Sequence, residues 1–298
     1  MIVSIYHNIN MYYICLENGR DGFGFQFYNQ IYGILLAKNF NTNYFYEPMS
    51  RIGHNYKQDE NFEKELNDFT NLSDLYPKIN FDEMIGINDL SKLETYLNKE
   101  IDKTIVIRLR KKCKDLYKYQ KLFNKNPEII QKISENFLKD KKNPYDNNKI
   151  NIAIHIRSGD ALFNVEFNKH RITNEEDYKI LIDYLHKKFK ENYLIHLFFE
   201  SKTTLGFGET KIHKIDENIF NINNLLGKNV ILHQNDDLRK DFLHFVFADY
   251  LFVAKSSFSV IASIFNKNKV YAFSDFCKCD WAEFKNIKRI HINNLSIE

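Results

Sequence analysis

The sequence is poor in residues that break or crosslink a chain. Its 298 residues include 10 glycines, 4 prolines, 4 cysteines and a single tryptophan. So few glycines and prolines exclude a collagen-like or low-complexity chain, and cysteines this sparse exclude a disulfide scaffold. Cys277 and Cys279 form a C-x-C pair that lacks the second ligand pair of a zinc site, so we expect reduced thiols.

Long apolar runs and an excess of charge of one sign are also missing. No stretch has the roughly 20 apolar residues of a membrane-spanning helix, and residues 1–16 lack the basic segment of a signal peptide. The 42 basic and 39 acidic residues leave a net charge of +3, too balanced for the continuous basic face of a duplex-binding protein. We therefore expect a cytoplasmic protein that does not bind nucleic acid.

The first half of the chain alternates strand and helix patterns. Residues 11–17 are typical of a strand and lead into Gly19, Gly22 and Gly24. A helix follows, with Phe27, Ile31, Ile34 and Leu35 at the spacing of one helical face. Further strands are predicted at 43–46 and 104–109, and further helices around 62–69, around 90–97 and from Pro127 onward.

Residues 139–148 form the most polar and breaker-rich segment, and we place a domain boundary after residue 148. The lysines between 139 and 142 are expected in a solvated loop. The predicted domains are therefore an α/β domain, 1–148, and a second α/β domain, 149–298.

The second half repeats the β-α-β pattern more clearly. Helix starts are expected at a capping box formed by Thr173 and Glu176, at Asp237, and at Ser256 or Ser257. Strands are predicted at 151–157, 193–199, 229–233, 250–254 and 269–273. Such repeats indicate a doubly wound parallel sheet, and two such halves facing a cleft make a GT-B-like α/β architecture.

His155 and Arg157 end the first strand of the second half. Side chains alternate along a strand, so both point to the same side. Ligands bind beyond the carboxyl ends of parallel strands, where an arginine holds a phosphate through two charged hydrogen bonds. The alternative interpretation is an ion pair between Arg157 and Asp160 that closes a turn, with His155 in the core.

A second feature suited to phosphate lies at residues 255–259, Lys-Ser-Ser-Phe-Ser. They follow an apolar strand and open an apolar helix, whose free N–H groups and positive end favour an anion. On its own this is an ordinary serine cap. Together with Arg157 it supplies two walls of a pyrophosphate site.

Both segments resemble the superfamily of alpha-1,2-, alpha-1,6- and protein O-fucosyltransferases, over most of the second half. Residues 152–160, IAIHIRSGD, resemble the H-[IV]-R-R-G-D signature, with Ser158 in place of the second arginine. Residues 249–259 are similar to the later segment that ends in S-x-F-S or T-F-S. In the first half, residues 22–26 resemble the G-x-G-N-Q loop, with Phe25 in place of the asparagine.

The resemblance implies that Arg157 contacts the β-phosphate of GDP and that His155 lies near the nucleotide. Asp241 stands where the alpha-1,6 enzymes carry a carboxylate that pairs with the guanine edge; a solvated carboxylate on a helix is the alternative. The other substrate-binding residues that it implies are Gly24, Gln26, Ser257, Phe258 and Ser259.

No D-x-D motif occurs in the sequence, so we expect no metal and no cofactor. Arg157 and helix N-termini must then neutralise the departing GDP, and inversion needs one displacement with a base for the acceptor hydroxyl. The resemblance makes Glu166 a candidate for that base, because it lies one position off a glutamate with this role in the alpha-1,6 branch. Asp160 is the alternative. His54, in a loop of the first half, is a candidate for the acceptor side.

The sequence thus predicts an inverting, metal-independent transferase that moves fucose from GDP-fucose to a glycan hydroxyl, with Arg157, Asp160 and Glu166 as catalytic residues. In this prediction residues 1–148 form the acceptor-side domain, and residues 149–298 form the Rossmann-like domain that binds the GDP-sugar. Two alternatives stay open. One is a transferase that uses another GDP-sugar. The other is a catalytically inactive relative that binds a nucleotide or glycan.

Overall fold

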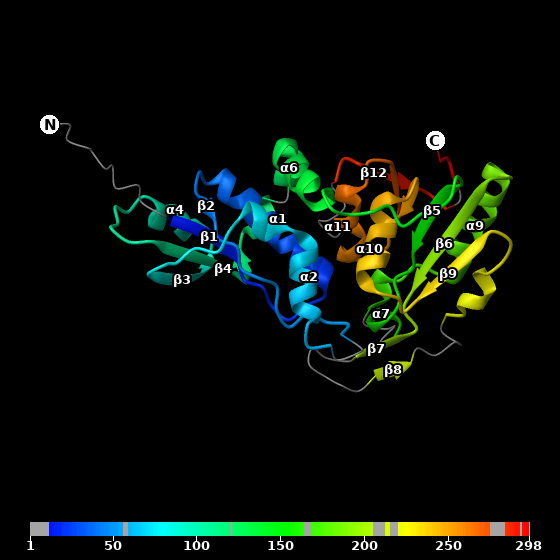
Figure 1. The fold of residues 1–298 in the computed structure, drawn as a ribbon, viewed down its shortest axis with the longest axis horizontal. Helices are drawn as coiled ribbons and strands as arrows, with labels where there is room; N and C mark the ends of the chain where they lie inside the picture. The colour runs from blue at the N-terminus through cyan, green and yellow to red at the C-terminus, as the bar shows by residue number, and fades with distance from the viewer. Residues whose placement is uncertain are drawn as a thin grey trace.

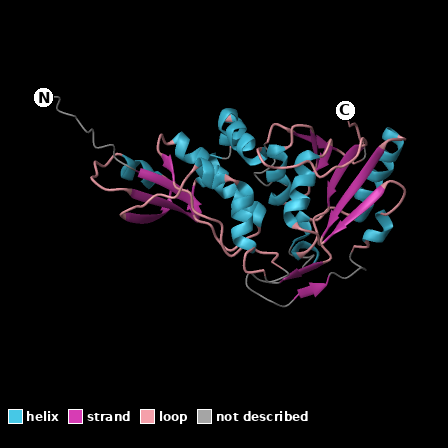
Figure 2. Ribbon diagram, viewed as in Figure 1, coloured by secondary structure: helices cyan, strands magenta, loops and turns pink. Residues whose placement is uncertain are grey.

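Most strands of the computed structural model form two parallel sheets against which the helices pack (Figures 1 and 2). The structure describes residues 12–55, 59–119, 121–163, 168–204, 212–214, 220–274, 284–292 and 294–297. The expected α/β class, a GT-B-like pair of Rossmann-type halves facing a cleft, is confirmed. No helix among these residues is long and apolar enough to span a membrane.

The first sheet has the strand order β2-β1-β4-β3, and all its strands run parallel. The strands are β1 (Tyr12–Leu16), β2 (Asn43–Tyr44), β3 (Glu83–Asp89) and β4 (Ile105–Lys114). The sequence did not predict β3. This edge strand is half exposed and contains Gly86, so it lacks the apolar run that identifies a buried strand.

The second sheet has the order β12-β11-β10-β5-β6-β9, again all parallel. Its strands are β5 (Ile150–His155), β6 (Tyr193–Phe199), β9 (Val230–Gln234), β10 (Tyr250–Phe252), β11 (Lys269–Phe273) and β12 (Ile287–Ile290). From β5 the chain builds the sheet toward β9, then crosses back to β10 on the other side of β5. The order therefore reverses between β5 and β10, where ligands bind in such sheets.

Helices cover both faces of the second sheet. Helix α9 (Glu175–Phe189) packs on one face, and α10 (Leu238–Phe247) with α11 (Ser257–Phe265) packs on the other, toward the first sheet (Figure 1). The first half contributes α1 (Phe23–Asn39), α2 (Phe62–Thr70), α3 (Leu72–Leu75), α4 (Ser91–Leu97), α5 (Leu122–Lys125) and α6 (Pro127–Leu138).

Short elements complete the described fold. They are the helix α7 (Asp160–Phe163), the 3-10 turns η1 (Leu116–Tyr119), η2 (Lys169–Arg171) and η3 (Ile222–Leu225), and the antiparallel strands β7 (Lys202–Thr204) and β8 (Ile212–Lys214).

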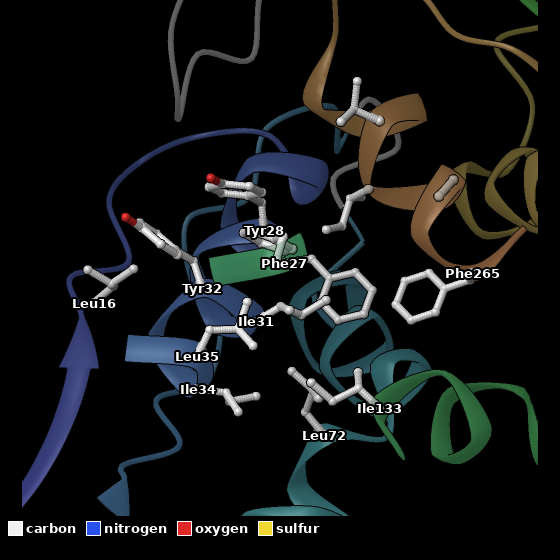
Figure 3. Close-up of a cluster of buried hydrophobic side chains, with 14 of the residues drawn as sticks. Leu16, Phe27, Tyr28, Ile31, Tyr32, Ile34, Leu35, Leu72, Ile133 and Phe265 are labelled. Atoms are coloured by element: carbon white, nitrogen blue, oxygen red, sulfur yellow. The ribbon is translucent and has the colours of Figure 1, made fainter. Parts of the chain in front are cut away.

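One hydrophobic core joins the two halves. Helix α1 is buried along almost its whole length, and Phe27 stacks on Phe265 of α11 with ring centroids 5.5 Å apart (Figure 3). Ile31, Leu72 and Ile133 belong to the same cluster. The domain division after residue 148 stays a prediction, and the structure adds that apolar packing continues across it.

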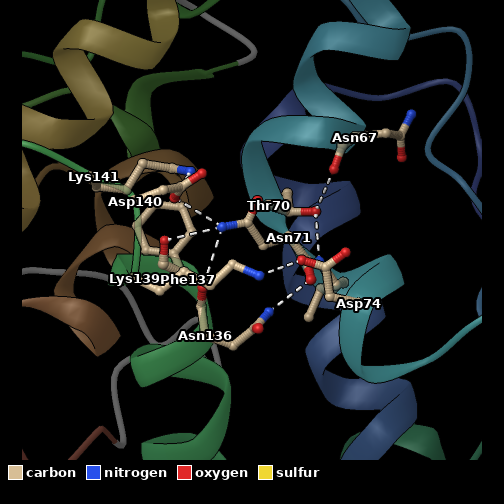
Figure 4. A network of polar contacts seen from close by, with 10 residues as sticks. Asn67, Thr70, Asn71, Asp74, Asn136, Phe137, Lys139, Asp140 and Lys141 are labelled. Carbon is tan, nitrogen blue, oxygen red and sulfur yellow. Dashed lines mark hydrogen bonds and ion pairs between the residues drawn. The ribbon is translucent and has the colours of Figure 1, made fainter.

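The segment after α6 is docked on the first half (Figure 4). Asn71, with a left-handed φ of 55°, donates from Nδ2 to Asp140 Oδ1 at 2.9 Å, and Lys139 pairs with Asp74. Lys141 Nζ lies 5.1 Å from the ring centroid of Phe69, and its side chain is only 9% exposed. The expectation of a fully solvated lysine loop is therefore wrong for Lys141.

The predicted helix start at Pro127 is confirmed, and so are two of the three starts predicted for the second half. Asp237 accepts a hydrogen bond from Arg239 N, and Ser256 accepts one from Phe258 N. The capping box at Thr173 and Glu176 is wrong, because α9 begins after Asn174 without a side-chain cap. Thr173 is buried there.

Candidate functional site

A cavity of about 470 Å³ opens at the carboxyl ends of β5 and β6, where the two halves meet. Both halves line it, the first through residues such as Gly22 and His54 and the second through residues such as Arg157 and Asp241. The reversal of strand order beside β5 makes this the expected place for a ligand.

Two helix N-termini meet at the cavity wall. A Cβ atom at Gly24, in the first turn of α1, would lie 2.4 Å from Phe258 Cα in the first turn of α11. Only a glycine permits this approach. The N-cap residues Gly22 and Ser256 both line the cavity, so two positive helix ends, one from each half, face the same space.

Arg157 lies beside these helix ends. Its side chain is 12% exposed, its guanidinium pairs with Asp160, and its Nε is buried without a hydrogen-bond partner among the described residues. Arg171 Nη1 lies 3.7 Å from the other oxygen of Asp160. The ion pair of the alternative interpretation is thus present, but Arg157 also lines the cavity and retains an unused donor.

His155 is a neutral residue of the cavity wall. Burial, assisted by the charge of Arg157, lowers its pKa to about 3. Its Nδ1 lies 2.8 Å from Ser259 Oγ, and its ring packs against Phe245, with centroids 5.3 Å apart. It therefore contributes a polar edge without adding positive charge.

Six of the predicted binding residues line the cavity: Gly24, His155, Arg157, Asp241, Ser257 and Phe258. Two others lie behind its wall. Gln26 is fully buried and donates to Asp21 O at 3.0 Å and Ser50 O at 2.9 Å, so it holds the loop of the first half. Ser259 is equally buried and contacts His155. The prediction that Gln26 and Ser259 contact the substrate directly is therefore corrected, because both residues support the cavity wall from behind.

Asp241 has the most unusual environment in the site. Its Oδ1 atom is buried and has no hydrogen-bond partner among the described residues. Burial, followed by the nearby charges of Asp236, Glu200 and Asp237, raises its pKa to about 8. A solvated helix carboxylate is therefore the wrong description, because this group is desolvated and faces a cavity.

Three histidines extend the wall behind Asp241. His233, Asp241 and His244 each place a potential metal ligand within 4.8 Å of the others. Both nitrogens of His233 already face partners, with His196 Nδ1 at 2.9 Å from Nε2 and Asp236 Oδ2 at 3.4 Å from Nδ1. His244 Nδ1 lies 2.8 Å from Lys240 O. The expected absence of a metal stays a prediction.

The candidates for the base differ in what surrounds them. Asp160 lines the cavity, but its two oxygens face Arg157 and Arg171. Glu166 lies outside the described residues. His54, the candidate for the acceptor side, lines the cavity and forms an ion pair with Glu200, Nδ1 to Oε1, at 3.2 Å.

Sequence reasoning missed Glu200. It follows β6 as a lone glutamate after an apolar strand, and its partner stands 146 positions earlier in the chain, in the other half. A carboxylate directly after a parallel strand is the available signal, since that position faces the ligand crevice.

Comparisons with known proteins give weak likenesses. No protein-family model matches the chain, and no curated protein does. The chain is similar to a solved structure of a mutant of Arabidopsis thaliana FUT1 in complex with GDP, with 10% identity, a TM-score of 0.40, and 88% of this chain and 70% of that chain covered. It is also similar to the glycotransferase of kitacinnamycin, with 8% identity, a TM-score of 0.33, and 96% and 87% covered. Such likenesses identify no substrate.

Proposed function

We propose that the protein is a glycosyltransferase that binds a GDP-sugar in the cavity between its halves and transfers the sugar with inversion. GDP-fucose is the donor that we favour, and a glycan hydroxyl is the acceptor. The observation that carries this proposal is the convergence of two helix N-termini and Arg157 on one cavity, beside the unpaired carboxyl of Asp241.

The diphosphate belongs at the helix ends. The N–H groups of α1 and α11 and the guanidinium of Arg157 supply donors and positive charge without a metal ion. When the anomeric bond breaks, negative charge grows on the β-phosphate oxygen. A guanidinium fixed by Asp160 stabilises that charge more than it stabilises the ground state.

The guanine base belongs at Asp241. A carboxylate accepts from both N1–H and the amino group of guanine, and adenine offers no such pair of donors. Guanine would supply the partners that Oδ1 lacks, so binding favours the ionised form of Asp241. His155 would then contact the nucleotide from the end of β5.

The test is a thermal-shift and calorimetric titration with GDP, ADP and UDP. We expect GDP to raise stability by about 2.7 kcal/mol at 100 times its Kd and the other two to have little effect. Asp241→Asn should remove most of this selectivity. Equal affinity for the three nucleotides would contradict the assignment of Asp241.

Turnover of GDP-fucose in EDTA tests the chemistry. We expect it to persist, because Arg157 and the helix ends neutralise the leaving group. Loss of activity in EDTA with recovery in Mn²⁺ would overturn the metal-independent mechanism. Tight GDP binding with turnover of another GDP-sugar would correct the donor, and binding without any turnover would indicate the inactive relative.

A further inference from the structure

Glu200 is fixed at the edge of the cavity by its backbone. It follows the last residue of β6, and Ser158 Oγ accepts a hydrogen bond from Glu200 N at 2.8 Å. Gly159 N donates to Glu200 O at 3.3 Å. The turn that carries Arg157 therefore also holds Glu200, which ties the two side chains to one rigid frame.

The Glu200 carboxylate occupies space that a side chain at position 159 would take. Gly159 has φ +59°, a conformation that favours glycine, and a Cβ atom there would lie 2.6 Å from Glu200 Oε2. The other oxygen, Oε1, faces His54 Nδ1 at 3.2 Å. One side of the carboxylate thus rests on the Arg157 turn, and the other contacts the first half of the protein.

His54 is held in an uncommon backbone conformation to make this contact. Its φ is +71°, in the left-handed region that non-glycine residues seldom adopt. Its Nε2 would lie 3.5 Å from a Cβ at Gly22, so the ring also packs at the N-cap of α1. The side chains of His54 and Glu200 are 25% and 33% exposed, so the pair borders the cavity.

The opposite charges of His54 and Glu200 favour the ionised form of both side chains. Burial alone would lower the pKa of His54, but the charge and hydrogen bond of Glu200 raise it. Burial alone would raise the pKa of Glu200, but His54 and then Arg157 hold it below its usual value. Glu200 is therefore ionised at neutral pH, whereas Asp241 is largely protonated and Asp160 is held between two arginines.

We propose that Glu200 is the general base of sugar transfer and that His54 is its positioning residue. This inference rests on the proposed function. The acceptor oxygen forms a bond to the anomeric carbon, and the bond from that carbon to the β-phosphate oxygen breaks, with its electron pair leaving on GDP. The hydroxyl proton passes to the Glu200 carboxylate, so Glu200 loses the negative charge that GDP gains.

Glu200→Gln keeps the shape of the side chain and removes its basicity. With GDP-fucose and water as the acceptor, we expect hydrolysis to fall roughly 10²-fold or more, while the Kd for GDP changes less than about threefold. Glu176→Gln, on the exposed side of α9, is the matched control and should hydrolyse normally. A Glu200→Gln protein that hydrolyses GDP-fucose at the normal rate overturns the proposal.

A reaction with azide distinguishes a general base from a residue that only supports the structure. Azide attacks without losing a proton, so Glu200→Ala should form fucosyl azide from GDP-fucose at a rate near that of wild-type hydrolysis. A Glu200→Ala protein that binds GDP normally but forms no azide product contradicts a base at this position. Failure of the wild-type protein to bind GDP would instead overturn the proposed function.

His54→Gln tests the positioning role. Without the imidazole the pKa of Glu200 rises, so the acid limb of the pH profile of kcat, measured at saturating GDP-fucose, should move to higher pH. A uniform loss at every pH, with the limb unmoved, would show that His54 only supports the fold.

Discussion

The two ends of the cavity differ in whether their charged side chains have partners. At the transfer end, defined by His54, Arg157, Asp160, Arg171 and Glu200, ion pairs link the charged side chains. At the proposed nucleotide end, Asp241 is half-buried, and its Oδ1 atom is buried without a partner among the described residues. Paired charges hold a fixed arrangement before a ligand arrives, whereas a buried group without a partner costs stability until a ligand supplies one.

The difference separates two kinds of functional residue. Residues at the transfer end act through fixed positions, so their effect should appear in the rate. Asp241 acts through a bond that forms only on binding, so its effect should appear in affinity. Each of the following experiments perturbs one end or the junction that joins them.

Arg157→Lys should have the largest effect, at the transfer end. Lysine keeps the positive charge but lacks the planar fork, so turnover of GDP-fucose should fall roughly 10²-fold, about 2.7 kcal/mol of transition-state stabilisation. Steady-state kinetics with a parallel denaturation curve is the measurement. Near-normal turnover in a well-folded variant would mean that Arg157 only closes a turn with Asp160.

Gly24→Ala perturbs the junction between the ends. The added Cβ would lie 2.4 Å from Phe258 Cα, so the first turns of α1 and α11 must separate, at a cost of roughly 1–3 kcal/mol in unfolding free energy. Gly227→Ala is the control, since a Cβ there meets nothing within 4 Å. Equal urea midpoints for the two variants would show that the helices do not need this approach.

A change of pH should have a smaller, graded effect at the nucleotide end. In the proposed complex guanine pairs with ionised Asp241, whose pKa is raised to about 8, so each binding event below that pH must release a proton. The affinity for GDP should therefore rise up to about tenfold per pH unit between pH 6 and 8, or 1.36 kcal/mol. Titration in buffers of different ionisation enthalpy measures the released proton. Asp241→Asn should flatten the dependence, and a flat wild-type profile would contradict the assignment.

The second sheet was predictable because its central strands are mostly apolar and end at polar turns. The predicted strand at 193–199 has the observed bounds of β6, and that at 269–273 has the bounds of β11. The edge strand β3 escaped because Glu83, Gly86 and Asp89 interrupt its apolar residues, and only Ile87 is buried. The start of α9 was misplaced because local capping chemistry cannot show that the fold buries Thr173.

The site was predictable where one segment carries it. His155, Arg157, Ser257 and Phe258 lie at strand or helix ends that the periodicity already locates. Glu200 was missed, because its position after an apolar strand becomes informative only once the fold brings His54 from the other half beside it. Gln26 and Ser259 show the opposite error, since residues next to a site in sequence can face away from it.

The stacking of Phe27 on Phe265 also bears on how the protein is made. A ribosome that has released only the first half leaves the aromatic side of α1 exposed to water, because α11 is made much later than α1. The core, the helix junction at Gly24 and the wall at Ser257 all need that later helix. A nascent chain should therefore expose this aromatic surface to chaperones and proteases until α11 has been made.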